Sequence, residues 1–528
     1  MAVHRVLQTL HARIGALAPW RARGLAFVLG FAAVFAMPPL YQIYLLIPAF
    51  SGLLWLVAGA SSRWRAFVVG WWFGAGFFTA GLYWVSFALL VDAAKFAWLV
   101  PFAVFGFAFG LGLFGAVAAW CVRAVPSGLA GRALLLAAMW VFLEWVRAWL
   151  FTGFPWNPLG SVWAFSDTFM QGASVVGVFG MSLLAALLAT LPGALTATPP
   201  ETKRLGLILN AGVLVVVAGA WLGGQQRLAA ATDTTVPDVR LRLVQPNIPQ
   251  AQKWRPELRE GHMMNQVTLA VAPPIAGDPK PTHVIWAETS APFFIGTHKP
   301  WLRLVGASTP SGGLTLLGAP RVVAGALADG ATLNVANSLL AIDDVGQVTA
   351  TYDKFHLVPF GEYVPLQDWL PLERITQGLG SFVAGPGPTT LDLKGLPPVS
   401  PLICYEIIFP GQVTDQQNRA QWILNLTNDG WYGRTAGPHQ HFVSARLRAV
   451  EEGLPVVRVA GTGISGIIDA YGRVMQRLEL DEKSFIDGDL PLPSQNLTVF
   501  AQFGNTVPLA LVILVALGGV IVARRSTV

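Results

Sequence analysis

Eight apolar stretches constrain this chain more than any other feature of its sequence. Most of them contain about 20 residues, which is the length an α-helix needs to cross the roughly 30 Å hydrocarbon core of a bilayer. Seven precede residue 223 and the eighth lies near the end of the chain. They occupy residues 24–37, 41–60, 66–90, 96–122, 133–151, 170–192, 205–222 and 506–523. Only 12% of the residues are charged, against roughly 25% in globular proteins. The sequence therefore predicts a membrane α-helical bundle of about eight transmembrane helices.

The basic residues orient this predicted bundle. If the N-terminus is cytoplasmic, Lys95 is the only basic residue in the short outer loops. The inner segments then contain Arg5, Arg13, Arg21, Arg23, Arg63, Arg65, Arg123, Arg132, Lys203, Arg204, Arg524 and Arg525. Lys and Arg collect in the cytoplasmic loops of membrane proteins. The asymmetry predicts cytoplasmic termini and places the long polar segment outside the cytoplasm.

Three domains follow from this pattern. We expect a bundle of seven spans in residues 1–222, an extracytoplasmic domain in residues 223–500, and a last transmembrane helix with a cytoplasmic tail in residues 501–528. The middle domain contains short apolar runs typical of strands, separated by loops and helices. The predicted strands are residues 239–244, 283–287, 314–317, 337–342, 399–404, 422–427 and 456–460, and the predicted helices are 255–271 and 439–452. Such a sequence predicts layered α/β packing.

One predicted strand ends in a cysteine. Pro401-Leu402-Ile403 leads into Cys404, and Tyr405, Glu406 and a Phe-Pro turn follow. The second cysteine, Cys121, lies in an apolar stretch, so Cys404 has no evident disulfide partner. An unpaired thiol outside the cytoplasm calls for a function. Cys404 is a candidate nucleophile.

Two further stretches supply groups that a thiol nucleophile needs. Glu288 ends the run Val284-Ile285-Trp286-Ala287, and Lys354 opens Lys354-Phe355-His356-Leu357-Val358-Pro359-Phe360-Gly361-Glu362-Tyr363-Val364-Pro365. The thiolate is the reactive form of cysteine, and Glu288 can accept the thiol proton. Lys354 can stabilise the thiolate and then the tetrahedral oxyanion. The set suits acyl transfer through a thioester.

Three more residues would assist this chemistry. The backbone N–H of Tyr405, directly after the nucleophile, would bind the oxyanion together with Lys354. Glu362 and Glu406 would hold Lys354 in place or assist the leaving group. A Cys–His mechanism using His356, His439 or His441 is an alternative, although nothing in the sequence fixes these histidines against Cys404.

Other functional classes receive little support. The chain has no basic run that would indicate nucleic acid, and no Cys/His cluster that would indicate a metal or another cofactor. A transporter would need paired ionisable residues in its spans, and these spans contain almost none, which argues against a transporter. Glu144 and Arg147, three apart near the end of one span, read as a local ion pair or as a lipid-headgroup site.

The motifs together resemble a known superfamily. The order Trp-x-Glu, then Lys-x-x-Leu-Val-Pro-Phe-Gly-Glu-Tyr-Val-Pro, then Cys-Tyr-Glu, then Asn-x-Thr-Asn-Asp-x-Trp is similar to the carbon–nitrogen hydrolases, or nitrilases. Flanked by seven spans and one, it resembles the apolipoprotein N-acyltransferase family. Ala287 stands where that family usually has Pro, and Pro246 where Gly is common. Both departures alter loop geometry and remove no reacting group.

The resemblance implies a fold and a set of roles. It implies a nitrilase-like αββα sandwich in which Glu288 is the general base, Lys354 the oxyanion partner and Cys404 the nucleophile. Glu362, Tyr405 and Glu406 match positions that support such a site. Trp254 matches a functional tryptophan on a loop that faces the membrane.

The resemblance also implies a reaction and a location. A phospholipid, typically phosphatidylethanolamine, would give its sn-1 acyl chain to Cys404, and the α-amino group of a diacylglyceryl-cysteine on an apolipoprotein would then accept it. The location would be the bacterial inner membrane, with the catalytic domain in the periplasm. Residues 366–382 are too apolar for an ordinary exposed loop, and we expect either a lid that dips into the outer leaflet or a loop packed on the core of the domain. A membrane-tethered amidase that hydrolyses a small amide is the alternative.

Overall fold

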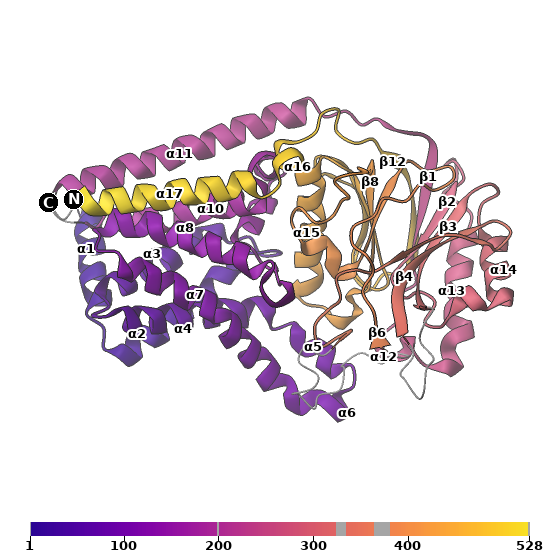
Figure 1. Ribbon diagram of the computed structural model, residues 1–528, viewed down its shortest axis with the longest axis horizontal. Coiled ribbons are helices and arrows are strands. Elements are labelled where there is room, and N and C mark those ends of the chain that lie inside the picture. The colour runs from indigo at the N-terminus through magenta and orange to yellow at the C-terminus, as the bar shows by residue number, and fades with distance from the viewer. Residues whose placement is uncertain (1, 198–199, 324–333, 364–380, 526–528) are drawn as a thin grey trace. The chain divides into compact units, whose positions relative to one another are not determined.

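The structure is a computed structural model that describes residues 2–197, 200–323, 334–363 and 381–525 (Figure 1). The chain forms two compact units. The first combines residues 1–86, 96–230 and 498–528, and the second combines residues 87–95 and 231–497. Each unit therefore contains segments that lie far apart in the sequence.

The first unit is helical. Its longer helices are α1 (Ala2–Gly15), α2 (Pro19–Ala33), α3 (Leu46–Gly59), α4 (Arg63–Leu82), α7 (Phe107–Ala124), α8 (Leu129–Arg147), α10 (Ala173–Ala194), α11 (Pro200–Ala229) and α17 (Thr506–Arg525). Its shorter helices include α9 (Asp167–Met170) and α16 (Val499–Phe503). Helices α5 (Val85–Leu90) and α6 (Ala93–Phe96) follow α4 and lie mostly in residues 87–95 of the second unit. The last apolar helix, α17, packs against α8 and α10.

Every predicted apolar stretch coincides with helix, although the stretch at 66–90 is divided between α4 and α5 by a turn at Tyr83 and Trp84. In the described part of the chain, five helices are long and apolar enough to cross a membrane. They are Phe102–Ala124, Leu129–Arg147, Ala173–Ala194, Lys203–Ala229 and Thr506–Arg524. Ile43–Gly59 is apolar but shorter. The total of eight spans stays a prediction.

Small residues bring helices of this unit into close contact. A Cβ atom on Gly30 of α2 would lie 1.9 Å from the carbonyl oxygen of Phe73 in α4, and one on Gly74 of α4 would lie 2.7 Å from Cα of Gly112 in α7. Side chains larger than hydrogen would push these pairs apart. Packing through small residues is typical of helices in membranes.

Glu144 and Arg147 are both buried in this unit. Glu144 Oε1 accepts hydrogen bonds from Trp140 Nε1 at 3.0 Å and from the backbone N–H of Leu159 at 2.8 Å. Arg147 donates to the carbonyl oxygen of Trp156 at 2.8 Å and to that of Phe154. The two charged residues therefore hold the segment that follows α8.

The second unit is built on two β-sheets. The first sheet has the strand order β12–β1–β2–β3–β4–β5, with β6 beside β4. Its strands are β1 (Thr235–Gln245), β2 (His283–Trp286), β3 (Leu314–Val322), β4 (Asn334–Asp343), β5 (Val348–Asp353), β6 (Ser381–Phe382) and β12 (Ser484–Pro491). The second sheet has the order β11–β10–β9–β8–β7. Its strands are β7 (Val399–Ile403), β8 (Trp422–Thr427), β9 (Val456–Ala460), β10 (Ser465–Ile468) and β11 (Val474–Leu478).

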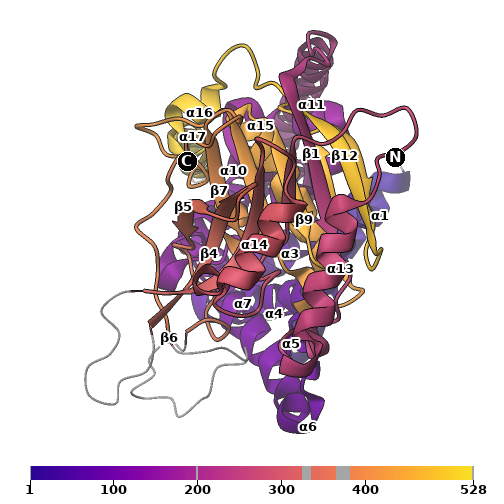
Figure 2. The ribbon, with the colours of Figure 1, turned by 90° about the vertical axis from the view of Figure 1, so that its right-hand side faces the viewer.

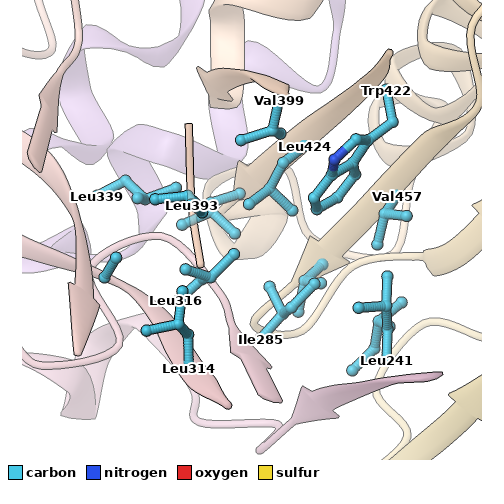
Figure 3. Close-up of a cluster of buried hydrophobic side chains, with 14 of the residues drawn as sticks. Leu241, Ile285, Leu314, Leu316, Leu339, Leu393, Val399, Trp422, Leu424 and Val457 are labelled. Carbon is cyan, nitrogen blue, oxygen red and sulfur yellow. The ribbon is translucent and has the colours of Figure 1, made fainter. Parts of the chain in front are cut away.

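Alternating side chains produce a four-layered sandwich. Ile285 points between the two sheets, where it packs with Trp422 and Leu424 of the second sheet (Figure 3). Leu243 belongs to the same buried cluster. Their neighbours Val244 and Trp286 pack instead with α13 (Arg259–Val271) and α14 (Lys299–Ser308), which cover the first sheet (Figures 1 and 2). Because α15 (Ala436–Glu452) packs on β9 of the second sheet, the predicted αββα sandwich is confirmed.

The predicted strands and both predicted helices are present, and the structure also contains β5, β10, β11, β12 and α14, which no predicted range covers. Two of these strands, β5 and β11, lie at sheet edges and offer few apolar residues to a prediction based on apolar runs, because β5 buries only Tyr352 and β11 only Leu478. Most of the predicted lid, residues 366–382, lies outside the described residues. Only its last two residues are described, and they form β6.

Candidate active site

Ends of strands bring the three predicted catalytic residues together. β2 is parallel to β3, and β5 runs in the same direction because β3, β4 and β5 are successively antiparallel. Glu288 lies two residues after β2, and Lys354 directly follows β5. Cys404 directly follows β7 in the second sheet. Carboxyl ends of strands in one direction meet at one edge of a sheet, where α/β folds place their ligands.

The Lys354 ammonium is held between two carboxylates. Its Nζ lies 2.9 Å from Glu362 Oε2 and 3.7 Å from Glu288 Oε1. Burial opposes the charged form, but Glu362 and Glu288 outweigh burial and raise the pKa of Lys354. An ammonium at this place can stabilise negative charge on the thiol sulfur or on an oxyanion.

Asn337, in β4, orients both carboxylates. Its Nδ2 donates to Glu288 Oε1 at 2.8 Å and to Glu362 Oε1 at 3.0 Å. Glu362 also accepts the backbone N–H of Val358 through Oε2 at 2.8 Å. Asn337 opens the predicted strand 337–342, but in the structure it lies inside β4, and the sequence pattern indicated no role for it. The carboxylate that could act as base is therefore fixed by its neighbours.

Cys404 adopts a strained backbone conformation. Its φ is +54°, a left-handed value that costs non-glycine residues about 1–3 kcal/mol and occurs mostly at functional sites. It begins a short 3-10 helix, Cys404–Ile408. Burial, and next the charge of Glu288, raise the pKa of the Cys404 thiol to about 12, while Lys354 opposes the rise. The resting group is a thiol, so attack requires a base.

Glu406 connects the loop that begins at Lys354 to the turn at Cys404, between β7 and the 3-10 helix. Its Oε1 accepts the backbone N–H groups of Phe355 at 2.7 Å and His356 at 3.1 Å. Its Oε2 accepts Tyr352 Oη–H at 2.9 Å and the N–H of Ile403 at 2.6 Å. Burial raises the pKa of Glu406 to about 7, against the effect of these bonds and of the Lys354 charge. Glu406 thus holds the backbone beside Lys354, whereas Glu362 contacts the ammonium itself.

A second lysine reaches the site and was missed in the sequence. Lys253 ends the short helix α12 (Gln250–Lys253), and its buried Nζ donates to the main-chain carbonyl of Glu288 at 2.9 Å. Burial lowers the pKa of Lys253 to about 8, and the charges of Glu288 and Cys404 oppose this shift. The only signal was its position next to Trp254. Trp254 itself is half-buried at the end of the helix.

Tyr405 and the histidines occupy distinct places. Tyr405 is buried, and its ring packs edge-on against His356 and Phe409. The ring of His356 stacks on Phe409 with centroids 3.7 Å apart. His441 lies 3.1 Å from Cys404, but through the main-chain carbonyl oxygen. The contact of His441 is therefore with the main chain of Cys404, and Glu288 stays the predicted base.

Comparison with known proteins gives the family. The apolipoprotein N-acyltransferase of Brucella suis is 39% identical over 500 residues, which cover 92% of this chain and 93% of the relative. That of Rhodopseudomonas palustris is 37% identical over 510 residues, 94% of each chain. This chain belongs to the apolipoprotein N-acyltransferase family.

Two family models match this member of the apolipoprotein N-acyltransferase family. The apolipoprotein N-acyltransferase N-terminal domain matches residues 29–191, and carbon–nitrogen hydrolase matches residues 318–497. The second match contains Lys354 and Cys404, whereas Glu288 precedes it. Among solved structures, an amidase from Nesterenkonia sp. is 19% identical, with 49% of this chain and 94% of that chain covered and a TM-score of 0.34.

Proposed function

We propose that this chain moves the sn-1 acyl chain of a phospholipid, typically phosphatidylethanolamine, to the α-amino group of a diacylglyceryl-cysteine on an apolipoprotein. The acyl group is carried as a thioester on Cys404. The observation that carries the proposal is the buried group of Glu288, Lys354 and Cys404 in a chain that also contains long apolar helices. Membership of the family supports the same acceptor.

In the first half-reaction, Glu288 takes the proton of the Cys404 thiol as sulfur attacks the ester carbonyl of the phospholipid. A carbon–sulfur bond forms, and the carbonyl electron pair becomes an oxyanion. The Lys354 ammonium and the backbone N–H of Tyr405 stabilise that charge. When the intermediate collapses, the carbon–oxygen bond breaks, and protonated Glu288 returns its proton to the leaving lysophospholipid oxygen.

In the second half-reaction, the α-amino group of the acceptor attacks the thioester carbonyl. Glu288 takes a proton from the attacking nitrogen, and the same donors stabilise the second oxyanion. The carbon–sulfur bond breaks, an amide forms, and the Cys404 sulfur recovers its proton from Glu288. Lys253 and Asn337 act throughout by holding Glu288 in place.

We place the protein in the bacterial inner membrane, with both termini cytoplasmic and the catalytic unit in the periplasm. The concentration of Arg and Lys in the predicted inner segments supports this orientation. Both substrates are membrane-anchored lipids or lipoproteins, so a site tethered by membrane helices meets them where they reside.

The proposal is tested by mass spectrometry of the purified full-length protein after incubation with phosphatidylethanolamine. We expect a long-chain acyl adduct on Cys404 that is absent from Cys404→Ala and strongly reduced in Glu288→Gln and Lys354→Ala. Cys121→Ala is the control and keeps the adduct. Hydrolysis of a small amide by wild type, with no lipid-derived adduct, would favour the tethered amidase and refute the transferase.

A further inference from the structure

A buried polar cluster lies next to the main chain of Cys404, and the mechanism above does not use it. His441 of α15 reaches the Cys404 carbonyl oxygen through Nε2 at 3.1 Å. Because a carbonyl oxygen only accepts, Nε2 is the donor. Asn425 of β8 approaches the same oxygen through Nδ2 at 3.4 Å. The direction of the Cys404 carbonyl is therefore set by side chains from two other elements.

The cluster in turn fixes His441. Asp429 follows β8, and its Oδ1 lies 2.8 Å from His441 Nδ1. Arg458 of β9 binds the other carboxylate oxygen of Asp429 at 2.8 Å and also contacts Asn425. These side chains are almost wholly buried. Burial alone would raise the pKa of Asp429, but Arg458 and His441 outweigh it and lower the pKa to about 2.

Burying several charged groups is costly unless each has partners. Here several of the partners are one another, and Arg458 and Asn425 also donate to the carbonyl oxygens of Ile464 and Leu402. Through His441 and Asn425 the cluster contacts the Cys404 carbonyl. That carbonyl belongs to the peptide unit whose N–H is that of Tyr405. In a trans peptide the C=O and N–H bonds point in opposite directions, so holding the oxygen towards His441 directs the N–H of Tyr405 away from the cluster.

We propose that His441, held by Asp429 and Arg458, is a positioning residue that aims the Tyr405 N–H at the oxyanion by fixing the Cys404 carbonyl. The inference rests on the proposed thioester chemistry. No proton passes through His441 in it. His441 acts by fixing the orientation of the peptide unit between Cys404 and Tyr405, and it does not touch the substrate.

This role separates two reactions of the same thiol. Acylation forms a tetrahedral oxyanion and needs the Tyr405 N–H. Alkylation by iodoacetamide displaces iodide, joins sulfur to carbon and forms no oxyanion. Rotation of the Cys404–Tyr405 peptide unit should therefore slow acylation and leave alkylation almost unchanged. A general distortion of the backbone around Cys404 would slow both reactions.

A pair of nearly isosteric variants tests the proposal in the full-length protein. In His441→Asn the amide reaches about as far as Nδ1, so it keeps the Asp429 contact and loses the Cys404 carbonyl. In His441→Gln the amide reaches about as far as Nε2 and can still donate to that carbonyl. Ser444→Ala, on the same helix and half-buried, is the control, because the Ser444 hydroxyl donates to the Gln440 carbonyl oxygen of its own helix. The readouts are the nitrophenol burst from a p-nitrophenyl ester, the acyl adduct from phosphatidylethanolamine, and the rate of alkylation by iodoacetamide.

We expect His441→Asn to lower the acylation rate about 10²- to 10³-fold, the loss typical of one oxyanion donor. The effect should fall on kcat rather than KM, because the lost interaction exists only in the transition state. His441→Gln should retain most of the rate. Alkylation should proceed as in wild type in both variants.

Three outcomes would overturn the inference. One is wild-type acylation in His441→Asn, another is an equal loss of acylation and alkylation, and the third is equal acylation in the two variants. A wild-type protein that gives the nitrophenol burst but no adduct from phospholipid refutes the proposed substrate instead. The comparison of the two His441 variants on the chromogenic ester still decides the role of His441 in that case.

Discussion

Two buried lysines approach Glu288, and their pKa values shift in opposite directions. Lys354 lies beside two carboxylates, which outweigh burial and favour its ammonium form. Lys253 donates to a main-chain carbonyl, and burial dominates its pKa. The same side chain thus supplies a permanent cation in one position and a group that titrates near pH 8 in the other.

Stability should depend on pH through Lys253. Its folded pKa, about 8, lies below the unfolded value of 10.5. The unfolded chain therefore binds more protons between these values, and stability rises with pH across the window, by at most about 3 kcal/mol. The contribution is complete above the unfolded pKa and is lost as pH falls through about 8.

Thermal unfolding between pH 7 and pH 11 checks this expectation. Lys253→Met should lack the rise that wild type shows, whereas Lys280→Met, at an exposed position, should follow wild type. A difference between wild type and Lys253→Met that stays constant with pH would contradict the assignment of the titration to Lys253.

Asn337 offers a second prediction at the same scale. Asn337→Asp replaces the bridging amide with a carboxyl group of the same shape, facing Glu288 and Glu362 at 2.8 and 3.0 Å. Three carboxylates cannot all ionise at such distances. We expect slow acylation at neutral pH and partial recovery as pH falls and the added carboxyl takes up a proton. A pH profile parallel to that of wild type would argue against the bridging role.

At the scale of elements, the loop that follows β2 and contains Glu288 packs directly against the backbone of β3 at Gly318. A Cβ atom on Gly318 would lie 2.5 Å from the backbone N of Thr289 and 2.7 Å from Cα of Glu288. Gly318 also receives a hydrogen bond from Ala291 N at 3.2 Å. β3 therefore fixes the position of Glu288, the proposed base, because Gly318 leaves no room for a side chain between the strand and the loop.

Gly318→Ala should displace Glu288. We expect a loss of about 1–3 kcal/mol of stability, which is usual for overpacking, together with a much larger fractional loss of acylation. Gly261→Ala is the matched control, because a Cβ atom there in α13 meets nothing within 4 Å and alanine favours helix. The rates of acyl-adduct formation and the melting temperatures of both variants check the prediction. Normal acylation by Gly318→Ala would show that the loop can move without consequence.

The residues that follow the buried strands were predictable from the sequence, whereas the edge strands β5 and β11 were not. Cys404, Glu288 and Lys354 each follow a strand, and for Cys404 and Glu288 that strand is an apolar run that the sequence displays directly. The exposed strands β5 and β11 contain few apolar residues, and they exist because neighbouring strands satisfy their backbone groups. Such pairing is a property of the sheet and leaves little trace in the local pattern.

At the scale of the whole molecule, the orientation in the membrane is the main prediction. We expect Ser61, in a predicted inner loop, to be cytoplasmic, and Lys280, in the catalytic unit, to be periplasmic. In a background of Cys121→Ala and Cys404→Ala, Lys280→Cys should react with a membrane-impermeant maleimide in spheroplasts. Ser61→Cys should react only after the membrane is permeabilised. The reverse labelling pattern would invert the topology.

The sequence by itself determined the apolar helices, the layered α/β unit and the three groups that point to thioester chemistry. Hydrophobic periodicity and strand endings are local, so they can be interpreted one segment at a time. Only the tertiary structure decided that Lys253 holds the main chain of Glu288, that Asn337 bridges two carboxylates, and that His441 holds the Cys404 carbonyl. These contacts join residues 25 to 49 positions apart. They depend on which strands become neighbours, and that is settled by packing two sheets around one core.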